Sequence, residues 1–518
     1  MIPAWVWSIL VVTIGCIAAL ILGSYLPDTG FDPIITLGLV FFTALCVLCA
    51  IYNNFPFLLA LGSWIPFFPH IFASFPTIAY FLAWMAVVLF FRLCLQGYLS
   101  YRQSFTWSLL FIFAWVPVRF LMNPVTKLGS NAGGTGVSGA MPYFNYCLAA
   151  CLMIFLGAVL NDRSKITYFM RWCGVVVYWS GMALLICAFI PATAPYLIAM
   201  GSFAAGNITE GVQRLVQLPG YGLFLVEVAL CPALFRFRLR IFFGTRMAPL
   251  SVLGSFWTSA FLFVLGLVMI IVGGNRSALA AAVIVIPLIL FLRRRSHATI
   301  LSLALMAVLV VGLHFTVSSM NGDVPTLFRG LGALDPSIDK ATGGDSSANW
   351  RYAVWDDGIK KIMEAPLTGK GFGNLPQHVE SSDAEKSQDF ETVLAGGLSH
   401  NGFINAAYGF GIPFSVALTV AIVVYFFKEA YLALRADKHD PEMQDLHAFL
   451  AAMFASYLLL IYSAFDLSSI SVWIYVAMSC VLSHLPKQEL LQSPDAGMPL
   501  RKYGEEPRPA GQYSYRPR

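Results

Sequence analysis

The sequence has little charge. Asp, Glu, Lys and Arg make up only 11% of its 518 residues, whereas a soluble domain carries about 25%. Hydrophobic residues make up 58% of the chain, and the mean hydropathy is +0.73. Apolar runs of about 20 residues recur along it, each long enough to cross a hydrocarbon core of about 30 Å. The composition excludes an ordinary soluble domain and predicts an all-α, polytopic membrane protein.

The sequence also lacks any cluster of cysteine and histidine residues with the spacing of a metal site. The eight histidines are scattered, and all ten cysteines fall within or at the ends of predicted spans. Cys46 and Cys49 have the spacing of a redox motif, but their position in mid-membrane favours simple packing. We therefore expect no metal, no cofactor, and no disulfide in the large outer loop.

We predict about 14 transmembrane spans. They are 4–24, 33–53, 55–73, 76–95, 105–121, 142–160, 173–190, 217–235, 250–272, 276–292, 298–318, 401–427, 446–465 and 468–484. Several prolines interrupt 55–73, so 12 or 13 spans and either side for the N-terminus stay possible. Residues 1–22 lack a basic region before the apolar run, which favours a first membrane helix over a removed signal peptide.

Basic residues gather in a few connections between the spans, and such residues mark the cytoplasmic side. They are Arg163, Lys165, Arg171, Arg236, Arg238, Arg240, Arg246, Arg293, Arg294, Arg295 and the basic residues after Leu485. We expect most of them to serve topology alone. This orientation predicts a bundle of about eleven spans over 1–318, an outer loop domain over 319–400, further membrane helices over 401–485, and a disordered cytoplasmic tail over 486–518.

Arg276 stands at the outer end of a predicted span, within Gly273–Ala281. An arginine at a membrane interface often extends to water. Here, however, small residues follow it and permit close helix packing. They favour a side chain directed into the protein near the outer surface, where an anion would be its natural partner.

The outer loop is an island of polarity that a bilayer cannot hold. Within it, an amphipathic helix is predicted over about 349–364, and Pro366 ends it. Arg351 lies in its first turn on the apolar side, so we expect it to point toward the membrane bundle. A salt bridge with Asp356 is the simpler alternative.

The segment Pro366–Gly373 alternates glycines around Lys370. Such a turn lets backbone N–H groups approach a phosphate or a sugar closely. His400 and Asn401 then open the next span. A histidine at such a position most often caps a helix, but it is also the side chain whose unperturbed pKa suits a general base near neutral pH.

Four segments occur in one order along the chain. They are Arg276–Leu279, Arg351–Trp355, Pro366–Gly373 and His400–Phe403. The three key positions in them, Arg276, Arg351 and His400, are spaced by about 75 and about 50 residues. Over roughly residues 250–430 this pattern resembles the bacterial O-antigen ligase and O-antigen polymerase superfamily. The family more often has Ser or Thr before its first Arg, where this chain has Gly273–Asn275.

The resemblance implies a GT-C-like, inverting and metal-independent glycosyltransferase in the bacterial inner membrane, with its active site facing the periplasm and its C-terminus in the cytoplasm. It would move a glycan from undecaprenyl diphosphate to an acceptor sugar hydroxyl. Arg276 and Arg351 would clamp the diphosphate, His400 would be the base, and Lys370 and Asn401 would bind substrate. The implied partners are the lipid-linked donor, a lipid-linked repeat or lipid A-core acceptor, and the bilayer, without a nucleic acid.

Several alternatives stay open. A polymerase of O-antigen or exopolysaccharide repeats is favoured slightly over a ligase, because the chain is long and nothing marks a lipid A site; protein O-glycosylation is a third variant. If His400 only orients the acceptor, the base would be Glu364, Asp389 or Glu391. A polytopic transporter or flippase is the rival class and needs polar groups in mid-membrane, of which Glu227 is the clearest.

Overall fold

The structure is a computed structural model that describes only part of the chain. The described residues are 55–64, 107–122, 141–190, 205–209, 212–215, 218–243, 246–253, 255–319, 344–372, 390, 394, 399, 401–437, 439–463 and 470–483. The expected spans 4–24, 33–53 and 76–95, most of 55–73, and the tail lie outside them, as do large parts of the outer loop.

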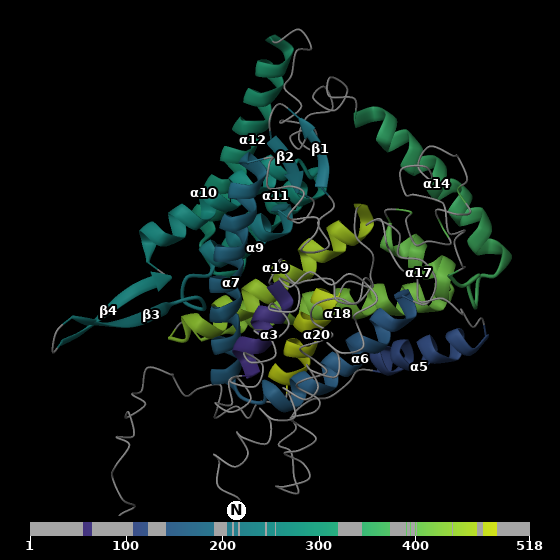
Figure 1. Ribbon diagram of the computed structural model, residues 1–518, viewed down its shortest axis with the longest axis horizontal. Helices are drawn as coiled ribbons and strands as arrows, with labels where there is room; N and C mark the ends of the chain where they lie inside the picture. The colour runs from purple at the N-terminus through teal and green to yellow at the C-terminus, as the bar shows by residue number, and fades with distance from the viewer. Residues whose placement is uncertain are drawn as a thin grey trace, which may run out of the picture.

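The described residues are largely helical (Figure 1). The helices are α3 (Phe55–Trp64), α5 (Trp107–Met122), α6 (Met141–Val159), α7 (Arg163–Phe189), α9 (Leu218–Leu230), α10 (Phe256–Gly273), α11 (Arg276–Leu292), α12 (Ser296–Ser319), α14 (Gly344–Glu364), α17 (Gly402–Phe410), α18 (Ile412–Arg435), α19 (Pro441–Ser463) and α20 (Ile470–Leu482). Within the described part, four helical segments are long and apolar enough to cross a membrane. They are Arg163–Phe189, Phe256–Gly273, Ile412–Arg435 and Pro441–Ile461. The prediction of a helical membrane protein is confirmed.

Two β-hairpins depart from the all-α prediction. Antiparallel strands β1 (Ala205–Thr209) and β2 (Val212–Leu215) form one, and β3 (Phe237–Phe243) and β4 (Arg246–Leu253) form the other. β4 takes the first residues of the expected span 250–272, so α10 begins only at Phe256. Ser255 caps this helix by accepting a hydrogen bond from the backbone N–H of Thr258.

Two of the expected spans have different bounds. The span expected over 173–190 is longer, because α7 begins at Arg163, ten residues before the expected start. Asp162 caps this start by accepting a hydrogen bond from the backbone N–H of Lys165. The span expected over 401–427 is broken at Gly411, where φ is +95°. With ψ at +161°, this residue has an extended conformation that cannot continue a helix and that glycine adopts readily, so the stretch forms α17 and α18 as two helices.

Small residues let neighbouring helices approach closely in the bundle. α9 and α10 meet at Gly222 and Gly266, where a Cβ atom on either residue would lie within 2.6 Å of the carbonyl oxygen of the other. Any larger residue would therefore force the two backbones apart. This is the small-residue contact by which helices associate in lipid, where apolar side chains gain little by leaving their surroundings.

The directions of α11 and α18 define two ends of the bundle. Arg293, directly after α11, lies against Asp445 of α19, and Arg294 donates a hydrogen bond to the carbonyl oxygen of Leu434 in α18. The C-terminal ends of α11 and α18 are therefore neighbours. Their lengths of 17 and 24 residues place their N-terminal ends, with Arg276 and Gly411, about 25 and 35 Å away.

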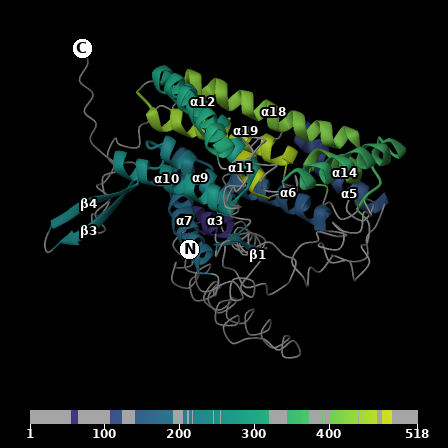
Figure 2. The same ribbon diagram turned by 90° about the horizontal axis from the view of Figure 1, so that it is seen from above.

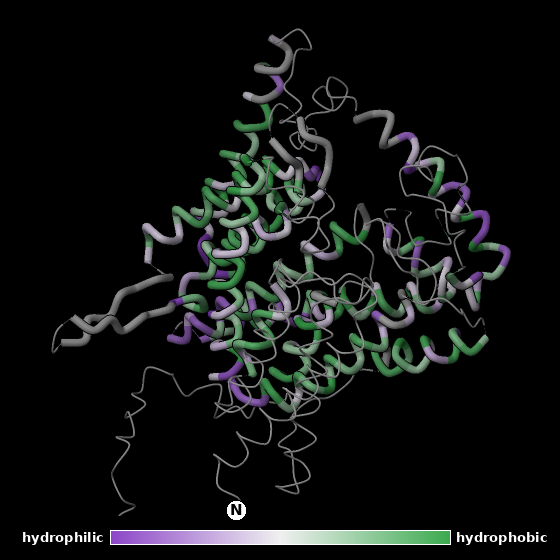
Figure 3. Tube along the Cα trace, viewed as in Figure 1, coloured by the Kyte–Doolittle hydropathy of each residue, from purple (hydrophilic) through white to green (hydrophobic). Residues whose placement is uncertain are grey.

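α14 is attached at the N-terminal end of α18. It lies beside α17 in both views (Figures 1 and 2). Figure 3 shows the bundle mostly in the colours of hydrophobic residues, whereas α14 carries several hydrophilic ones. The amphipathic helix expected over 349–364 is present, and it begins five residues earlier, at Gly344.

Candidate active site

The packing of α14 on α17 fixes the helix that carries Arg351. The contact is a buried cluster of Val354, Ile362, Leu394, Ala407 and Tyr408. Gly358 sits inside this contact, where a Cβ atom would lie 3.0 Å from Ile404 and 3.1 Å from Leu394. The close approach over several turns means that α14 is docked firmly on α17.

A single hydrogen bond links α14 to the residue before His400. The indole Nε1 of Trp355 donates to the carbonyl oxygen of Ser399 over 2.8 Å. Arg351 stands one turn before Trp355 and is half-buried. Its alternative partner Asp356 has its carboxylate oxygen 2.6 Å from Nζ of Lys360. His400 itself lies outside the described residues, so its role stays a prediction.

Asn401 has a structural task at the start of α17. It is buried, and its side-chain oxygen accepts hydrogen bonds from the backbone N–H groups of Phe403 and Ile404, at 3.0 and 3.2 Å. These bonds satisfy two of the four free N–H groups at the helix start. The helix cap therefore already uses the side-chain oxygen of Asn401 that the predicted binding of substrate would also use.

Three backbone N–H groups of the glycine-rich turn are bonded within the protein. The N–H groups of Lys370 and Gly371 donate to the carbonyl oxygen of Tyr408 over 2.7 and 3.3 Å, and that of Gly369 donates to Ala365 over 2.8 Å. These bonds occupy groups that the sequence analysis offered to a phosphate or a sugar. Sequence alone did not show that the turn would dock on the end of α17.

Glycine is needed in the turn for backbone packing. Gly369 has φ +69°, and a Cβ atom there would lie 2.6 Å from the carbonyl oxygen of Tyr408 and from the backbone nitrogen of Gly411. Gly411 also approaches the turn closely, because a Cβ atom added there would lie 2.2 Å from the carbonyl oxygen of Leu367. The turn and the α17–α18 break therefore lock together.

The side chain of Lys370 forms an ion pair at the end of α14. Its Nζ lies 2.5 Å from a carboxylate oxygen of Glu364. This hydrogen bond, with the positive charge that makes it, lowers the pKa of Glu364. A lower pKa makes a carboxylate a weaker base, which argues against Glu364 as the alternative to His400.

Arg119 is a site residue that the sequence analysis missed. It is buried near the C-terminal end of α5, and its Nη2 donates to the carbonyl oxygen of Gly369 over 2.9 Å. Trp115, one turn earlier, donates to the carbonyl oxygen of Phe410 over 2.8 Å. The signal was available, because a lone arginine in an apolar span usually faces the protein interior and has a task there.

Arg276 is the first residue of α11, and its neighbours explain the departure from the family pattern. Gly274 ends α10 in the left-handed conformation, with φ +61°. Asn275 then caps α11 by accepting from the N–H groups of Ser277 and Ala278 over 3.0 and 3.2 Å. Ser, Thr and Asn are interchangeable in this role, so Arg276 keeps a capped helix start. Its side chain is half-buried.

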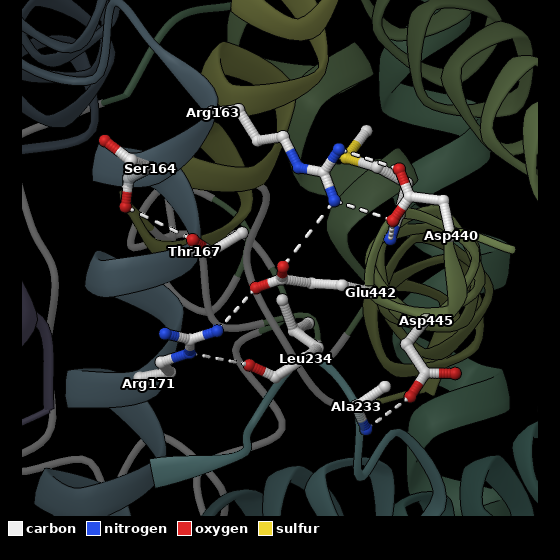
Figure 4. A network of polar contacts seen from close by, with 10 residues as sticks. Arg163, Ser164, Thr167, Arg171, Ala233, Leu234, Asp440, Glu442 and Asp445 are labelled. Atoms are coloured by element: carbon white, nitrogen blue, oxygen red, sulfur yellow. Dashed lines mark hydrogen bonds and ion pairs between the residues drawn. The ribbon is translucent and has the colours of Figure 1, made fainter. Parts of the chain in front are cut away.

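A network of charged residues lies at the end of the bundle where α19 begins (Figure 4). Arg163 holds Asp440 through two hydrogen bonds of 2.7 and 2.6 Å, and Arg171 lies 2.6 Å from Glu442. Arg293 lies 2.6 Å from the buried Asp445. The expectation that these arginines serve topology alone is therefore incomplete, because all three also tie neighbouring helices to α19.

The fold defines a polytopic helical membrane protein in which α14, the glycine-rich turn and α17 pack together at the N-terminal end of α18. Within the described residues, no group of three or more His, Cys, Asp and Glu is placed to hold a metal ion.

Residues 261–419 match the family model described as O-antigen ligase. This match confirms the resemblance to the O-antigen ligase and polymerase superfamily over that segment. No curated protein sequence matches the chain. The matched segment contains every residue that was predicted for the site. They are Arg276, Arg351, Lys370, His400 and Asn401.

Proposed function

We propose that the protein is an inverting glycosyltransferase that moves a glycan from undecaprenyl diphosphate to a sugar hydroxyl on the periplasmic side of the inner membrane. The observation that carries the proposal is the hydrogen bond from Trp355 to Ser399. It ties the helix of Arg351 to the residue before His400. The family match supports the same grouping, because residues 261–419 contain Arg276 as well as Arg351 and His400.

The proposed reaction is a single displacement at the anomeric carbon of the donor. The acceptor oxygen forms the new glycosidic bond while the bond from that carbon to the diphosphate oxygen breaks. His400 takes the hydroxyl proton, and the lipid diphosphate leaves with the bonding electrons. Arg276 and Arg351 stabilise the charge that develops on it, because a guanidinium is permanently charged and its fork matches a phosphate. Fixed positive charge of this kind takes the place of a divalent metal in the proposal.

The turn has a supporting role in this proposal. Arg119 and the N–H groups of the turn hold it against α17, and this sets the position of Lys370 beside the end of α14. Lys370 then adds positive charge near the donor. A polymerase acting on O-antigen or exopolysaccharide repeats is our preferred variant over a ligase acting on a lipid A-core acceptor.

A transporter or flippase is the second candidate, and one observation favours it. Glu227 is fully buried in α9 and accepts a hydrogen bond of 3.0 Å from Ser456 in α19. Buried acids within membrane helices often mark substrate or proton pathways. The enzyme remains preferred because the family match covers the segment with Arg276, Arg351 and His400, and Glu227 lies outside that segment.

The test is an assay of the purified full-length protein with a defined undecaprenyl-diphosphate-linked repeat, offered with a second lipid-linked repeat or with lipid A-core as acceptor. We expect His400→Ala to lower turnover by about 10²–10⁴ while donor binding is kept, the usual contribution of a positioned base. His400→Gln separates proton transfer from orientation, and wild-type activity should fall below about pH 6. His439→Ala, an exposed histidine at the other end of the bundle, is the control and should behave as wild type.

Three outcomes would count against the proposal. Full activity of His400→Gln would leave His400 as an orienting residue, and wild-type rates for Arg276→Lys and Arg351→Lys would remove the diphosphate clamp, since Lys keeps the charge but loses the fork. Transport of the lipid-linked repeat without any new glycosidic bond, lost in Glu227→Gln, would favour the second candidate.

A further inference from the structure

α14 has an apolar stripe that the α17 contact does not use. Tyr352, Ile359 and Met363 lie between 55 and 63% exposed. Their spacing of seven and four residues places them along one side of the helix. Val354 and Ile362, which pack on α17, lie on another side. A helix that exposes three large apolar residues in a row needs something to cover them.

The stripe continues beyond the end of α14. Leu367, 69% exposed, follows in the turn, directly before the close contact with Gly411. The carbonyl oxygen of Pro366 accepts from the N–H group of Ile412, the first residue of α18, over 2.8 Å. The backbone therefore joins the end of α14 directly to the beginning of α18, with the exposed Leu367 between them.

The exposed side of α18 is a lipid-facing surface. Its large exposed residues recur every three or four positions. They are Ile412, Val416, Val420, Val424, Phe427 and Tyr431. α18 is one of the helices long and apolar enough to cross a membrane. In such a helix an exposed apolar side faces the hydrocarbon.

We propose that the stripe of Tyr352, Ile359, Met363 and Leu367 lies in the surface of the bilayer, next to the N-terminal end of α18. The partner is membrane lipid, and the argument is the continuity of the stripe with the lipid-facing side of α18. A tyrosine suits this depth, because its ring is apolar and its hydroxyl reaches the headgroups. The contact holds the helix of Arg351 at a fixed height above the membrane.

The polar residues beside the stripe fit the same position. Lys360 and Asp356 flank it and form an exposed ion pair of 2.6 Å with each other. An interfacial helix has this arrangement, with an apolar side in the lipid boundary and charges along its edge in the headgroup layer. The proposal rests on the membrane location of the protein and not on its proposed reaction.

The test places a small fluorescent amino acid at position 359 or, as the matched control, at position 360 of the full-length chain. Each variant is reconstituted in lipid nanodiscs that hold one copy of the protein. We expect the probe at 359 to emit at shorter wavelength and to be quenched by brominated lipid roughly twofold more than the probe at 360, the result of burial in the headgroup and acyl boundary. Equal quenching at both positions would overturn the proposal.

A second measurement distinguishes lipid from protein as the cover. Iodide in the water should quench the probe at 360 more strongly than the probe at 359. A probe at 359 that is shielded from iodide but also from brominated lipid would be covered by another part of the chain, and the proposal would then be wrong. The variant Ile359→Ser with Met363→Ser should keep its thermal unfolding in detergent while lipid quenching of a probe at 352 declines; unchanged quenching there would contradict the continuous stripe.

Discussion

Different interactions hold the helices together at the two ends of the bundle. At the end where α19 begins, pairs of opposite charges join the helices, such as Arg163 with Asp440 and Arg293 with Asp445. At the end where α17 meets α18, backbone hydrogen bonds to Tyr408 and glycine contacts at Gly369 do so. Both ends contain arginines. Among the described residues, only those at the first end form ion pairs with carboxylates in α19 or directly before it.

The difference indicates what each end is built for. A buried ion pair needs both partners, because removing one leaves the other charge buried and unpaired in a medium of low dielectric constant. Its arginines are therefore committed to structure. At the other end the backbone secures the turn, and within the described residues Arg119 is bound by a carbonyl oxygen and by no carboxylate. The second end is therefore closed by backbone contacts in place of buried ion pairs to α19.

The largest effect is expected when an ion pair is broken at the first end. Asp445→Ala leaves Arg293 without its carboxylate and removes the acceptor of the Ala233 N–H group. We expect a loss of about 3–5 kcal/mol in the free energy of unfolding, measured by denaturant in detergent micelles. Lys165→Ala is the control, since its pair with Asp162 is partly exposed and should be worth about 0–1 kcal/mol. Similar losses for both variants would mean that burial does not decide the strength of these pairs.

A smaller effect is expected for the backbone contact at the second end. Gly369→Ala forces a left-handed conformation on a residue with a Cβ atom, and that atom meets the carbonyl oxygen of Tyr408. We expect a loss of about 2–3 kcal/mol from these two costs together.

The matched control for this variant is Gly312→Ala in α12, where an added Cβ atom meets nothing within 4 Å. It should be neutral or stabilising by up to about 1 kcal/mol, because alanine favours helix. If Gly369→Ala unfolds like this control, close packing does not hold the turn.

The sequence predicted those features that depend on local pattern. The bounds of α11 agree with the expected span, because a long apolar run between Asn275 and Arg293 has clear start and stop signals. The break at Gly411 was missed because the apolar run continues through it, although Gly411 and Pro413 in the first turn of α18 are a local signal for it. Ion pairs were missed for a similar reason, as Arg163 and Asp440 are 277 residues apart.

The same distinction applies to the candidate site. Lys370, Arg351 and Arg276 were chosen because residue type and order carry a signal, and their roles stay predictions. The hydrogen bonds from the N–H groups of the turn to Tyr408 could not be predicted from the sequence, because they depend on where the turn docks. The lone arginine Arg119 was visible in its apolar span, but its partner was not, since Gly369 is 250 residues away.

The smallest effect is expected at a partly exposed ion pair of the second end, Lys370 with Glu364. The hydrogen bond from Lys370 holds the pKa of Glu364 below its usual value of 4.5 in the folded protein. The folded state therefore binds this proton less readily than the unfolded state, so the pair contributes stability above about pH 4.5 and loses it as the pH falls through the folded pKa. Because the carboxylate is exposed and screened by water, the contribution is small.

Glu364→Gln should accordingly lower the unfolding temperature only slightly at pH 7, and its difference from wild type should disappear toward pH 3. Lys370→Met should remove the same pH dependence, and the double variant should add nothing further, since both changes break one interaction. The measurement is the unfolding temperature of the four proteins between pH 7 and pH 3. A Glu364→Gln effect at pH 7 as large as that of Asp445→Ala would overturn the contrast between the two ends, because charge would then hold both of them.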